Sequence, residues 1–205
     1  MRVVKNRIGS KLLIATGNPG KIAEIRDLLR EQPWKVLEPA DLNLDVHVQE
    51  TGSDYAENAA IKARAWAEAS GCLVLADDSG LEVKALNGEP GLHSARYAGP
   101  DRTDAERRLF LLTKLEGYPR PWHARFVACA AAASPDGWLE TVFGYCEGEI
   151  VPEERGTMGF GYDPIFQVEG TGTTMAELKM HEKNRIRHRA HDVLAVIPAL
   201  KRKML

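Results

Sequence analysis

The chain has 205 residues, of which 44% are hydrophobic and 27% are charged, and its formal net charge is −2. This length and apolar content are enough to bury one sizeable core. Because the charge is almost balanced, the composition excludes a globally basic protein that binds nucleic acid or membrane surfaces, and any polyanion must be met by local positive charge.

The cysteines and the N-terminal segment indicate where the protein works. Three widely spaced cysteines, none of them in a CxxC pair, indicate a reduced, cytoplasmic protein without a disulfide framework or a zinc site. No apolar run reaches the ~18 residues that a membrane span needs. Residues 1–10 are basic but lack the apolar region of a signal peptide, so we expect a flexible leader before one domain over residues 11–205.

The first predicted elements are a strand over residues 11–15, a glycine-containing loop over 16–21 and a helix that ends near residue 32. Asn18 suits the N-cap of this helix, and the proline after it suits the first helical position. A strand, a loop and a helix N-terminus in this order form a common anion site. Lys21 favours phosphate as the anion, although the loop lacks the residues of a Walker A motif.

A second helix is predicted over residues 53–69. Thr51 and Asp54 stand at the spacing of a capping box at its start. Asn58 and Lys62 are four residues apart, so they share one face of this helix. Taken alone, Lys62 could simply be solvated.

The most informative stretch is LVLADDSG, residues 73–80. Its apolar start predicts a buried strand, and Asp77 and Asp78 stand where we expect that strand to end. Two adjacent carboxylates are costly to desolvate without a positive partner, and a divalent metal is a suitable one. We therefore expect a Mg²⁺-bound polyphosphate at this strand end, with a short alternating strand following over residues 81–86.

The middle of the chain contains two turn signals and one helix. Asn87 and Gly88 predict a hairpin turn, and the glycine-rich residues 89–99 predict an exposed loop. Thr103 and Glu106 form a capping box at the start of a helix. Its apolar face is expected to consist of three leucines, at positions 109, 112 and 115.

Two long extended runs, residues 122–133 and 138–147, predict an antiparallel hairpin. The sequence between them, Ser-Pro-Asp-Gly, has the residues of a tight turn. The stretch MGFGYDPIF follows at residues 158–166. Its glycines let the backbone bend closely around a ligand, and we expect Phe160 and Tyr162 to offer flat faces on which a planar base stacks.

The C-terminal segment HEKNRIRHRAH, residues 181–191, is the only dense basic cluster. Alone it could be the solvated face of a helix. Helical spacing of apolar residues, at positions 186, 190, 193, 194 and 197, predicts a docked helix that ends or kinks before Pro198.

Six stretches, in this order, carry a resemblance to a known family. They are TGNPGK (16–21), ETG with ENAAIKA (50–63), ADDSG (76–80), GEPGLHSARYAG (88–99), GTMGFGYDPIF (156–166), and MAEL followed by EKNRIRHR (175–189). The chain resembles the inosine/xanthosine triphosphate pyrophosphatases over nearly its whole length. It departs from the family pattern at Gln49 and Ala190, and neither change removes a group that the chemistry needs.

The resemblance implies an α/β fold with two lobes around a long mixed β-sheet, flanking helices and a substrate cleft between the lobes. It also implies a homodimer and Mg²⁺-dependent cleavage of ITP, dITP and XTP to the monophosphate and pyrophosphate. Asp78 would be the proton acceptor and a metal ligand, with Glu50 as the second metal ligand. The implied substrate-binding residues are Thr16, Gly17, Asn18, Pro19, Gly20, Lys21, Lys62, Ser79, Phe160, Gly161, Tyr162, Asp163, Lys183, His188 and Arg189.

Base selection has a physical basis in the donors of the basic cluster. Hypoxanthine and xanthine present a 6-keto acceptor, which Lys183, His188 and Arg189 could satisfy, whereas adenine would leave these donors unpaired. At ~100° per residue, Lys183 would lie on the opposite helix face from the other two. We therefore expect a regular helix to start at residues 186–188, with Lys183 in the turn before it.

Two other functions remain open at this point. A hydrolase of modified pyrimidine nucleotides could share the architecture, although the MGFGYDPIF and EKNRIRHR stretches favour a purine. A nucleotide sensor that binds without turnover is the second alternative. The intact set of acids argues against it, because a pure binder has no use for a general base.

Overall fold

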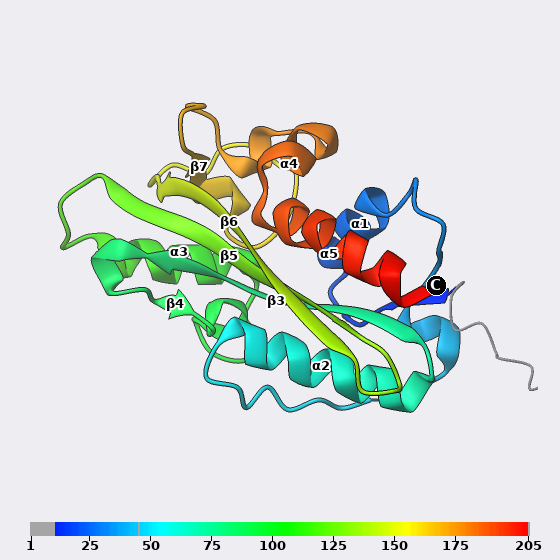
Figure 1. Ribbon diagram of the computed structural model, residues 1–205. Coiled ribbons are helices and arrows are strands. Elements are labelled where there is room, and N and C mark those ends of the chain that lie inside the picture. The colour runs from blue at the N-terminus through cyan, green and yellow to red at the C-terminus, as the bar shows by residue number, and fades with distance from the viewer. Residues whose placement is uncertain (1–10, 45, 205) are drawn as a thin grey trace, which may run out of the picture. The chain divides into compact units, whose positions relative to one another are not determined.

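The computed structural model of the protein describes residues 11–44 and 46–204, so the predicted leader over residues 1–10 lies outside the described part. The strands are β1 (Lys11–Ile14), β2 (Lys35–Leu37), β3 (Leu73–Val83), β4 (Pro90–Gly91), β5 (Trp122–Ala133), β6 (Leu139–Ile150) and β7 (Phe166–Val168). The α-helices are α1 (Pro19–Leu28), α2 (Tyr55–Ser70), α3 (Asp104–Leu115), α4 (Met180–Ile186) and α5 (His188–Met204) (Figure 1).

Within these ranges the strands form one mixed sheet in the order β2-β1-β3-β5-β6-β7, with β4 paired to β3. β1 runs parallel to β2 and to β3, whereas β4 is antiparallel to β3 and β7 is antiparallel to β6. The predicted α/β class with a mixed sheet and helices is therefore confirmed. The substrate cleft that the resemblance implies stays a prediction.

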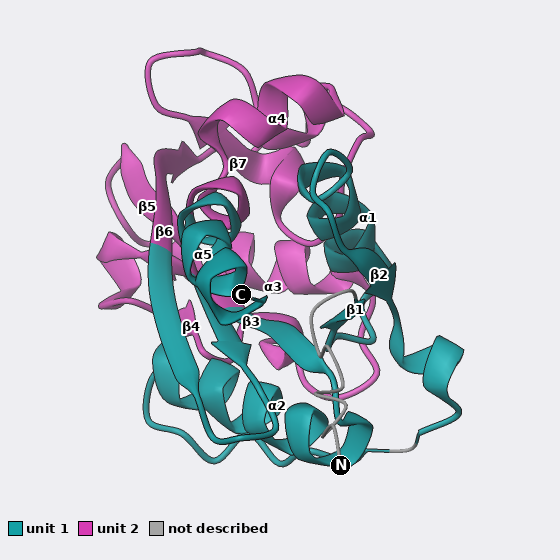
Figure 2. Cartoon of the chain, turned by 45° about the vertical axis from the view of Figure 1, so that its right-hand side comes forward, with its two compact units in different colours: residues 1–78, 129–143, 192–205 teal, residues 79–128, 144–191 magenta. Residues whose placement is uncertain are grey.

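The chain divides into two compact units, which Figure 2 colours separately. Unit 1 contains the residues up to Asp78 together with 129–143 and 192–205, and unit 2 contains 79–128 and 144–191. β3, β5, β6 and α5 therefore contribute residues to both units. In β3 the border falls between Asp78 and the residue that follows it.

Unit 1 is built around β1, the first half of β3 and the inner faces of α1 and α5. Its buried apolar cluster contains Leu12, Ile14, Ile25, Leu29, Trp34, Leu73, Leu75, Ala130, Ala132, Val193, Val196, Ile197 and Leu200. The continuous apolar run of β3 is explained by this burial, because a parallel central strand is covered on both faces.

Two helix boundaries in unit 1 differ from the prediction. α1 ends at Leu28 and not near residue 32, because Trp34 packs into the core and the chain must turn back toward β2. α2 is capped by Asp54, whose side chain accepts a hydrogen bond from the Glu57 N–H at 2.8 Å. Thr51 therefore lies before the cap, and the predicted pairing of Thr51 with Asp54 is wrong.

β3 does not end at its two acids. It continues as one strand of 11 residues to Val83, so Asp77 and Asp78 lie inside the strand and not at its end. The strand can carry both acids because each faces a lysine: Lys21 lies 3.0 Å from Asp77, and Lys62 lies 3.0 Å from Asp78. We expected the two negative charges to end the strand. Instead, lysines from α1 and α2 pair with them, and the strand continues.

Unit 2 has its own core, between α3, the adjoining parts of the strands and the segment around β7. The buried cluster contains Leu81, Val83, Leu86, Leu111, Leu115, Trp122, Ala124, Phe126, Cys146, Ile150, Tyr162, Ile165, Phe166, Val168 and Met175. The predicted capping box at Thr103 and Glu106 is confirmed. Of the three leucines expected on its apolar face, Leu115 is buried, Leu112 packs partly buried against the core, and Leu109 is 66% exposed; Leu111 is buried as well.

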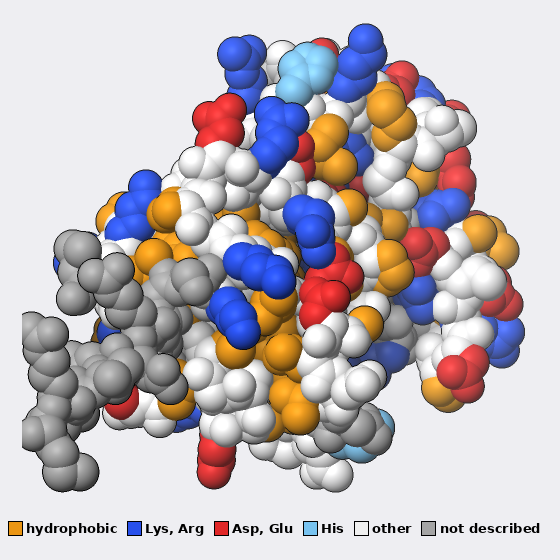
Figure 3. Space-filling model, turned by 90° about the vertical axis from the view of Figure 1, so that its right-hand side faces the viewer, with side chains coloured by type: hydrophobic (Ala, Val, Ile, Leu, Met, Phe, Trp, Pro, Cys, Tyr) orange, Lys and Arg blue, Asp and Glu red, His pale blue; other side chains and the backbone are white. Residues whose placement is uncertain are grey.

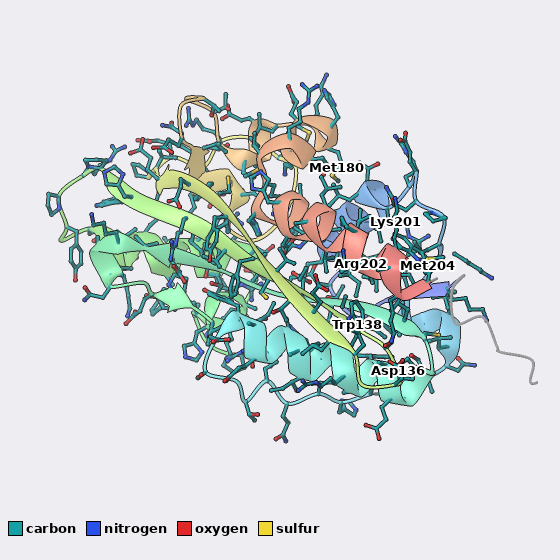
Figure 4. The ribbon with its side chains drawn as sticks, viewed as in Figure 1. Asp136, Trp138, Met180, Lys201, Arg202 and Met204 are labelled. Atoms are coloured by element: carbon teal, nitrogen blue, oxygen red, sulfur yellow. The ribbon has the colours of Figure 1, made fainter. Side chains whose placement is uncertain are left out.

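The two predicted hairpin turns are present. β5 and β6 are neighbours joined by residues 134–138, where the Ser134 N–H donates to the Trp138 carbonyl at 3.0 Å. Lys203, at the end of α5, lies 2.6 Å from Asp136 of this turn, and Figure 4 shows the turn near that helix end. Asn87 and Gly88 both adopt positive φ, as the turn between β3 and β4 requires.

The stretch over residues 89–99 is only partly the exposed loop that its composition suggests. It contains β4 and a 3₁₀ turn, Ser94–Arg96. Ser94 is buried, accepts a hydrogen bond from the Leu81 N–H at 2.8 Å and donates to the Gly91 carbonyl at 2.6 Å. These bonds fasten the stretch to β3.

The C-terminal helix α5 continues through Pro198, so of the predicted end or kink before that residue, the end is wrong. Pro198 has no N–H to donate to the Leu194 carbonyl, so the helix continues with one backbone hydrogen bond fewer at this point. No helix among the described residues has the length and apolarity needed to cross a membrane. Figure 3 shows basic and acidic side chains interspersed on one face of the molecule.

Candidate active site

The glycine-containing loop enters α1 as the sequence predicts. The Asn18 side chain accepts hydrogen bonds from the N–H groups of Gly20 and Lys21, at 2.9 and 3.1 Å. Thr16 accepts from the Asn18 N–H at 3.2 Å, so the loop is closed by its own side chains. The Lys21 ammonium lies 3.0 Å from the buried carboxylate of Asp77, which fixes this cation against β3.

Lys62 connects two predicted metal ligands. Its ammonium lies 3.0 Å from Asp78 Oδ1 and 3.1 Å from Glu50 Oε1. α2 supplies the lysine, β3 supplies one acid, and the segment before α2 supplies the other. Two acids that are far apart in sequence, Glu50 and Asp78, thus contact the same ammonium group.

Burial and charge shift the pKa values of this pair. Burial raises the pKa of the Asp78 carboxyl above its ordinary value, although Lys62 and Lys21 counteract this effect. Burial alone would lower the pKa of the Lys62 ammonium, but attraction from Asp78, Asp77 and Glu50 outweighs it, and the pKa is raised. Lys62 is therefore a firm positive charge, and Asp78 is a stronger base than an exposed carboxylate.

Sequence reasoning assigned no role to Asn58 beyond sharing a helix face with Lys62. Its side-chain amide donates to Asp78 Oδ2 at 3.3 Å, and its carbonyl oxygen accepts from the Gly52 N–H at 2.8 Å. The signal that could have found it is an asparagine, a poor helix former, inside an alanine-rich helix.

In unit 2 the MGFGYDPIF stretch meets the basic cluster at Asp163. This carboxylate is 0% exposed and lies 3.0 Å from both Lys183 Nζ and Arg187 Nη2. Lys183 also donates to the Met158 carbonyl at 3.2 Å. Sequence reasoning missed Arg187, although its place inside the basic cluster was a signal.

The aromatic residues of this stretch have different surroundings. Phe160 is half-buried, and the guanidinium carbons of Arg187 and Arg189 lie 5.1 and 5.9 Å from its ring centre. Tyr162 is only 5% exposed, packs in the core and donates its hydroxyl to the Ser94 carbonyl at 2.9 Å. The expectation that the Tyr162 ring offers an open stacking face is therefore wrong.

The basic cluster bends between Lys183 and His188, as the geometric argument requires. Arg187 is extended, with φ −76° and ψ 143°, and it separates α4 from α5. Lys183 lies within α4, however, and not in a turn. His188 stacks on Phe126 with ring centres 4.9 Å apart, and Arg189 donates to the Ser79 hydroxyl at 2.9 Å.

The predicted site residues thus form two groups, one in each unit. Asp78 with its lysines and the glycine-containing loop belongs to unit 1, whereas Ser79, Asp163 and the basic cluster belong to unit 2. The two groups are covalently continuous, because Asp78 and Ser79 are consecutive residues of β3. Within residues 11–44 and 46–204, no three His, Cys, Asp or Glu side chains gather as a ready-made metal cluster.

A glycine-containing loop at a helix start is an anion site, and fixed lysine charges suit phosphoryl chemistry, so the fold and the site together define an α/β protein that acts on phosphates. The chain belongs to the Ham1 family, which it matches over residues 12–198.

The similarity to individual relatives covers almost the whole chain. A dITP/XTP pyrophosphatase of Thermus thermophilus is 46% identical over 196 residues, covering 94% of this chain and 93% of the relative. A dITP/XTP pyrophosphatase of Bacillus subtilis is 43% identical over 184 residues, covering 89% and 93%. The solved Ham1 protein of Staphylococcus aureus is 39% identical with a TM-score of 0.82, covering 96% of this chain and all of that one.

Proposed function

We propose that this protein is a dITP/XTP pyrophosphatase, which hydrolyses ITP, dITP and XTP to the monophosphate and pyrophosphate and so removes them from the nucleotide pool. The observation that carries the proposal is the charge network of unit 1, in which Lys62 joins Asp78 to Glu50 and Lys21 holds Asp77. Phosphoryl chemistry needs such fixed charges more than it needs a covalent intermediate. The Ham1 relatives named above support the same activity.

The network also suits Mg²⁺, which completes the proposal. Mg²⁺ is usually held by one or two carboxylates, waters and substrate phosphates, so a cluster of three protein ligands is not required. Asp78 and Glu50 already share one cation, the Lys62 ammonium, and are therefore placed to share another. When bound, the metal would neutralise phosphate charge and acidify a coordinated water.

The residues of unit 1 then have distinct roles. Asp78 accepts the proton of the attacking water, and its raised pKa makes it better matched to neutral pH than an ordinary carboxylate. The loop from Thr16 to Lys21 binds the phosphates, and Lys62 stabilises their charge. Asp77 holds Lys21 in place.

The residues of unit 2 bind the nucleoside. Phe160 is the stacking face, because Tyr162 is buried in the core. Lys183, His188 and Arg189 offer donors to the 6-keto group of the base, and the buried Asp163 orients the first of them. Adenine would leave a buried donor unpaired, which costs about 1–3 kcal/mol.

A panel of nucleotides, assayed for pyrophosphate release with Mg²⁺ and with EDTA, tests the proposal. We expect dITP, ITP and XTP to be cleaved far faster than ATP, and EDTA to abolish turnover. A preference for a modified pyrimidine nucleotide would favour a different hydrolase. Tight binding without any turnover would favour a sensor.

Two further expectations accompany this function. We propose that the protein is a cytoplasmic homodimer that needs neither nucleic acid nor membrane for its activity. Light scattering coupled to gel filtration measures the mass in solution, and twice the monomer mass of 22.7 kDa is expected. A monomer that retains full activity would contradict the dimer.

A further inference from the structure

Asn58 is a buried polar residue whose contacts join two parts of the charge network. It lies on α2 and is 3% exposed. Its amide nitrogen is 3.3 Å from Asp78 Oδ2, and its oxygen is 2.8 Å from the Gly52 nitrogen, two residues after Glu50. One side chain therefore touches both the strand that carries Asp78 and the segment that carries Glu50.

The orientation of the Asn58 amide is fixed by chemistry. A backbone N–H can only donate, so the group that faces Gly52 must be the carbonyl oxygen of Asn58. Its NH₂ group then necessarily points to Asp78. Gly52 permits this approach because a Cβ at that position would stand 2.8 Å from the Asn58 oxygen and 2.6 Å from Glu57 Cβ.

The two oxygens of Asp78 consequently have different partners. Oδ1 faces the Lys62 ammonium at 3.0 Å, whereas Oδ2 faces the Asn58 amide. With a donor on each oxygen, rotation of the carboxylate about its Cβ–Cγ bond is restricted. The distance of 3.3 Å is at the long end for a hydrogen bond, as is common for catalytic groups without substrate.

We propose that Asn58 is a positioning residue that holds the Asp78 carboxylate in the orientation needed to accept a proton, a proposal that rests on the role of Asp78 proposed above. Asparagine is a poorer helix former than the alanines around it. The hydrogen bond to Asp78 explains why an asparagine stands inside α2, because an alanine at this position has no side-chain donor for that bond.

A purely structural role is the competing explanation, in which Asn58 only anchors the Gly52 segment. Two variants separate these roles. Asn58→Asp keeps size and the acceptor for the Gly52 N–H but replaces the donor that faces Asp78. Asn58→Ala removes both contacts. Trp66→Leu is the control, since it alters another buried residue of α2 without touching Asp78.

The experiment measures steady-state kinetics with dITP, melting temperature, and calorimetric binding of a non-hydrolysable dITP analogue. For both Asn58 variants we expect kcat to fall by about 10²-fold, while in the uncharged variant Asn58→Ala KM and the analogue's Kd change by less than about threefold. Trp66→Leu should lower the melting temperature at least as much and keep kcat near the wild-type value.

The outcomes distinguish this inference from the proposed function. Wild-type kcat in Asn58→Asp, or an equal loss of kcat in Trp66→Leu, would overturn the positioning role. Should Asn58→Asp fail to fold, Asn58→Ala decides by the same comparison. Asp78→Asn is assayed in parallel: if it stays active, the role of Asp78 itself fails, whereas an inactive Asp78→Asn with active Asn58 variants refutes only the role of Asn58.

Discussion

The strongest stability prediction concerns Asp163, the buried carboxylate of unit 2. Asp163→Asn removes the negative charge that lies 3.0 Å from Lys183 and from Arg187, while keeping the size of the side chain. The side chains of all three residues are almost fully buried, so water cannot replace the lost charge. A buried charge left without its partner is expected to destabilise the fold.

The magnitude follows from the burial. Breaking a buried ion pair by removing one partner costs about 3–5 kcal/mol. For a chain of this length each kcal/mol lowers the melting temperature by about 2–4 °C, so we expect a decrease of about 6–20 °C. Lys183 and Arg187 each lose their ion pair with Asp163, so two buried interactions are broken by one substitution.

Differential scanning calorimetry and urea unfolding measure the change. The matched control is Glu140→Gln, which removes the charge from an exposed pair with Arg202 and should cost no more than about 1 kcal/mol. Asp163→Asn combined with Lys183→Met should be less destabilised than the sum of the two single changes, because one of the two cations that pair with Asp163 is then absent. A loss in Asp163→Asn no greater than in the control would refute the reasoning.

The remaining predictions concern three other positions. Gly159→Ala should destabilise the protein by about 1–3 kcal/mol and lower activity, because Gly159 has φ +96° and an added Cβ would collide with Asp163 and Lys183; calorimetry and kinetics test this. Lys62→Met should lower kcat/KM for dITP by about 10²-fold, since a fixed positive charge is lost, and an unchanged value would contradict its role. Burial raises the pKa of the Cys129 thiol to about 12, so its contribution to stability is present below about pH 9 and lost as the pH rises toward 12. The urea midpoint should therefore fall more steeply from about pH 8.5 to 10.5 in the wild type than in Cys129→Ala, and parallel curves would count against this explanation.

Features of the fold that depend on a few neighbouring residues could be predicted from sequence. The Asn18 cap, the capping box at Thr103 and the turns at Asn87 and residues 134–137 are local, because each is decided by side chains that bond the adjacent backbone. The break between α4 and α5 was predicted by geometry. It followed from the requirement that Lys183 and His188 face the same ligand.

Features that depend on distant residues were missed. Leu109 and Leu194 have helical apolar spacing but are exposed, because the position of each helix on its unit decides which face is buried. Tyr162 has the sequence context of an open ring in a glycine-rich turn, but it is buried and bonded to Ser94, which is distant in sequence. β3 was expected to end at its acids because Lys21 and Lys62 cannot be paired with them from spacing alone.

The candidate site also has a part that sequence predicts and a part that it does not. Motifs predict which residues belong to the site, but they do not predict which of these residues contact one another. Nothing in the sequence shows that Asp163 holds both Lys183 and Arg187, or that Asn58 bridges Asp78 and Gly52. Such pairings depend on how α2 and α4 dock, which is set by tertiary packing and not by local sequence.

The most direct test of the proposed activity is the identity of the products formed from dITP. Phosphorus NMR of the reaction with Mg²⁺ distinguishes the two phosphoanhydride bonds that could be cleaved. We predict dIMP and pyrophosphate in equal amounts, with no dIDP at any time, and loss of both products when Asp78 is replaced by asparagine. Release of orthophosphate together with dIDP would contradict the assignment of this chain as a pyrophosphatase.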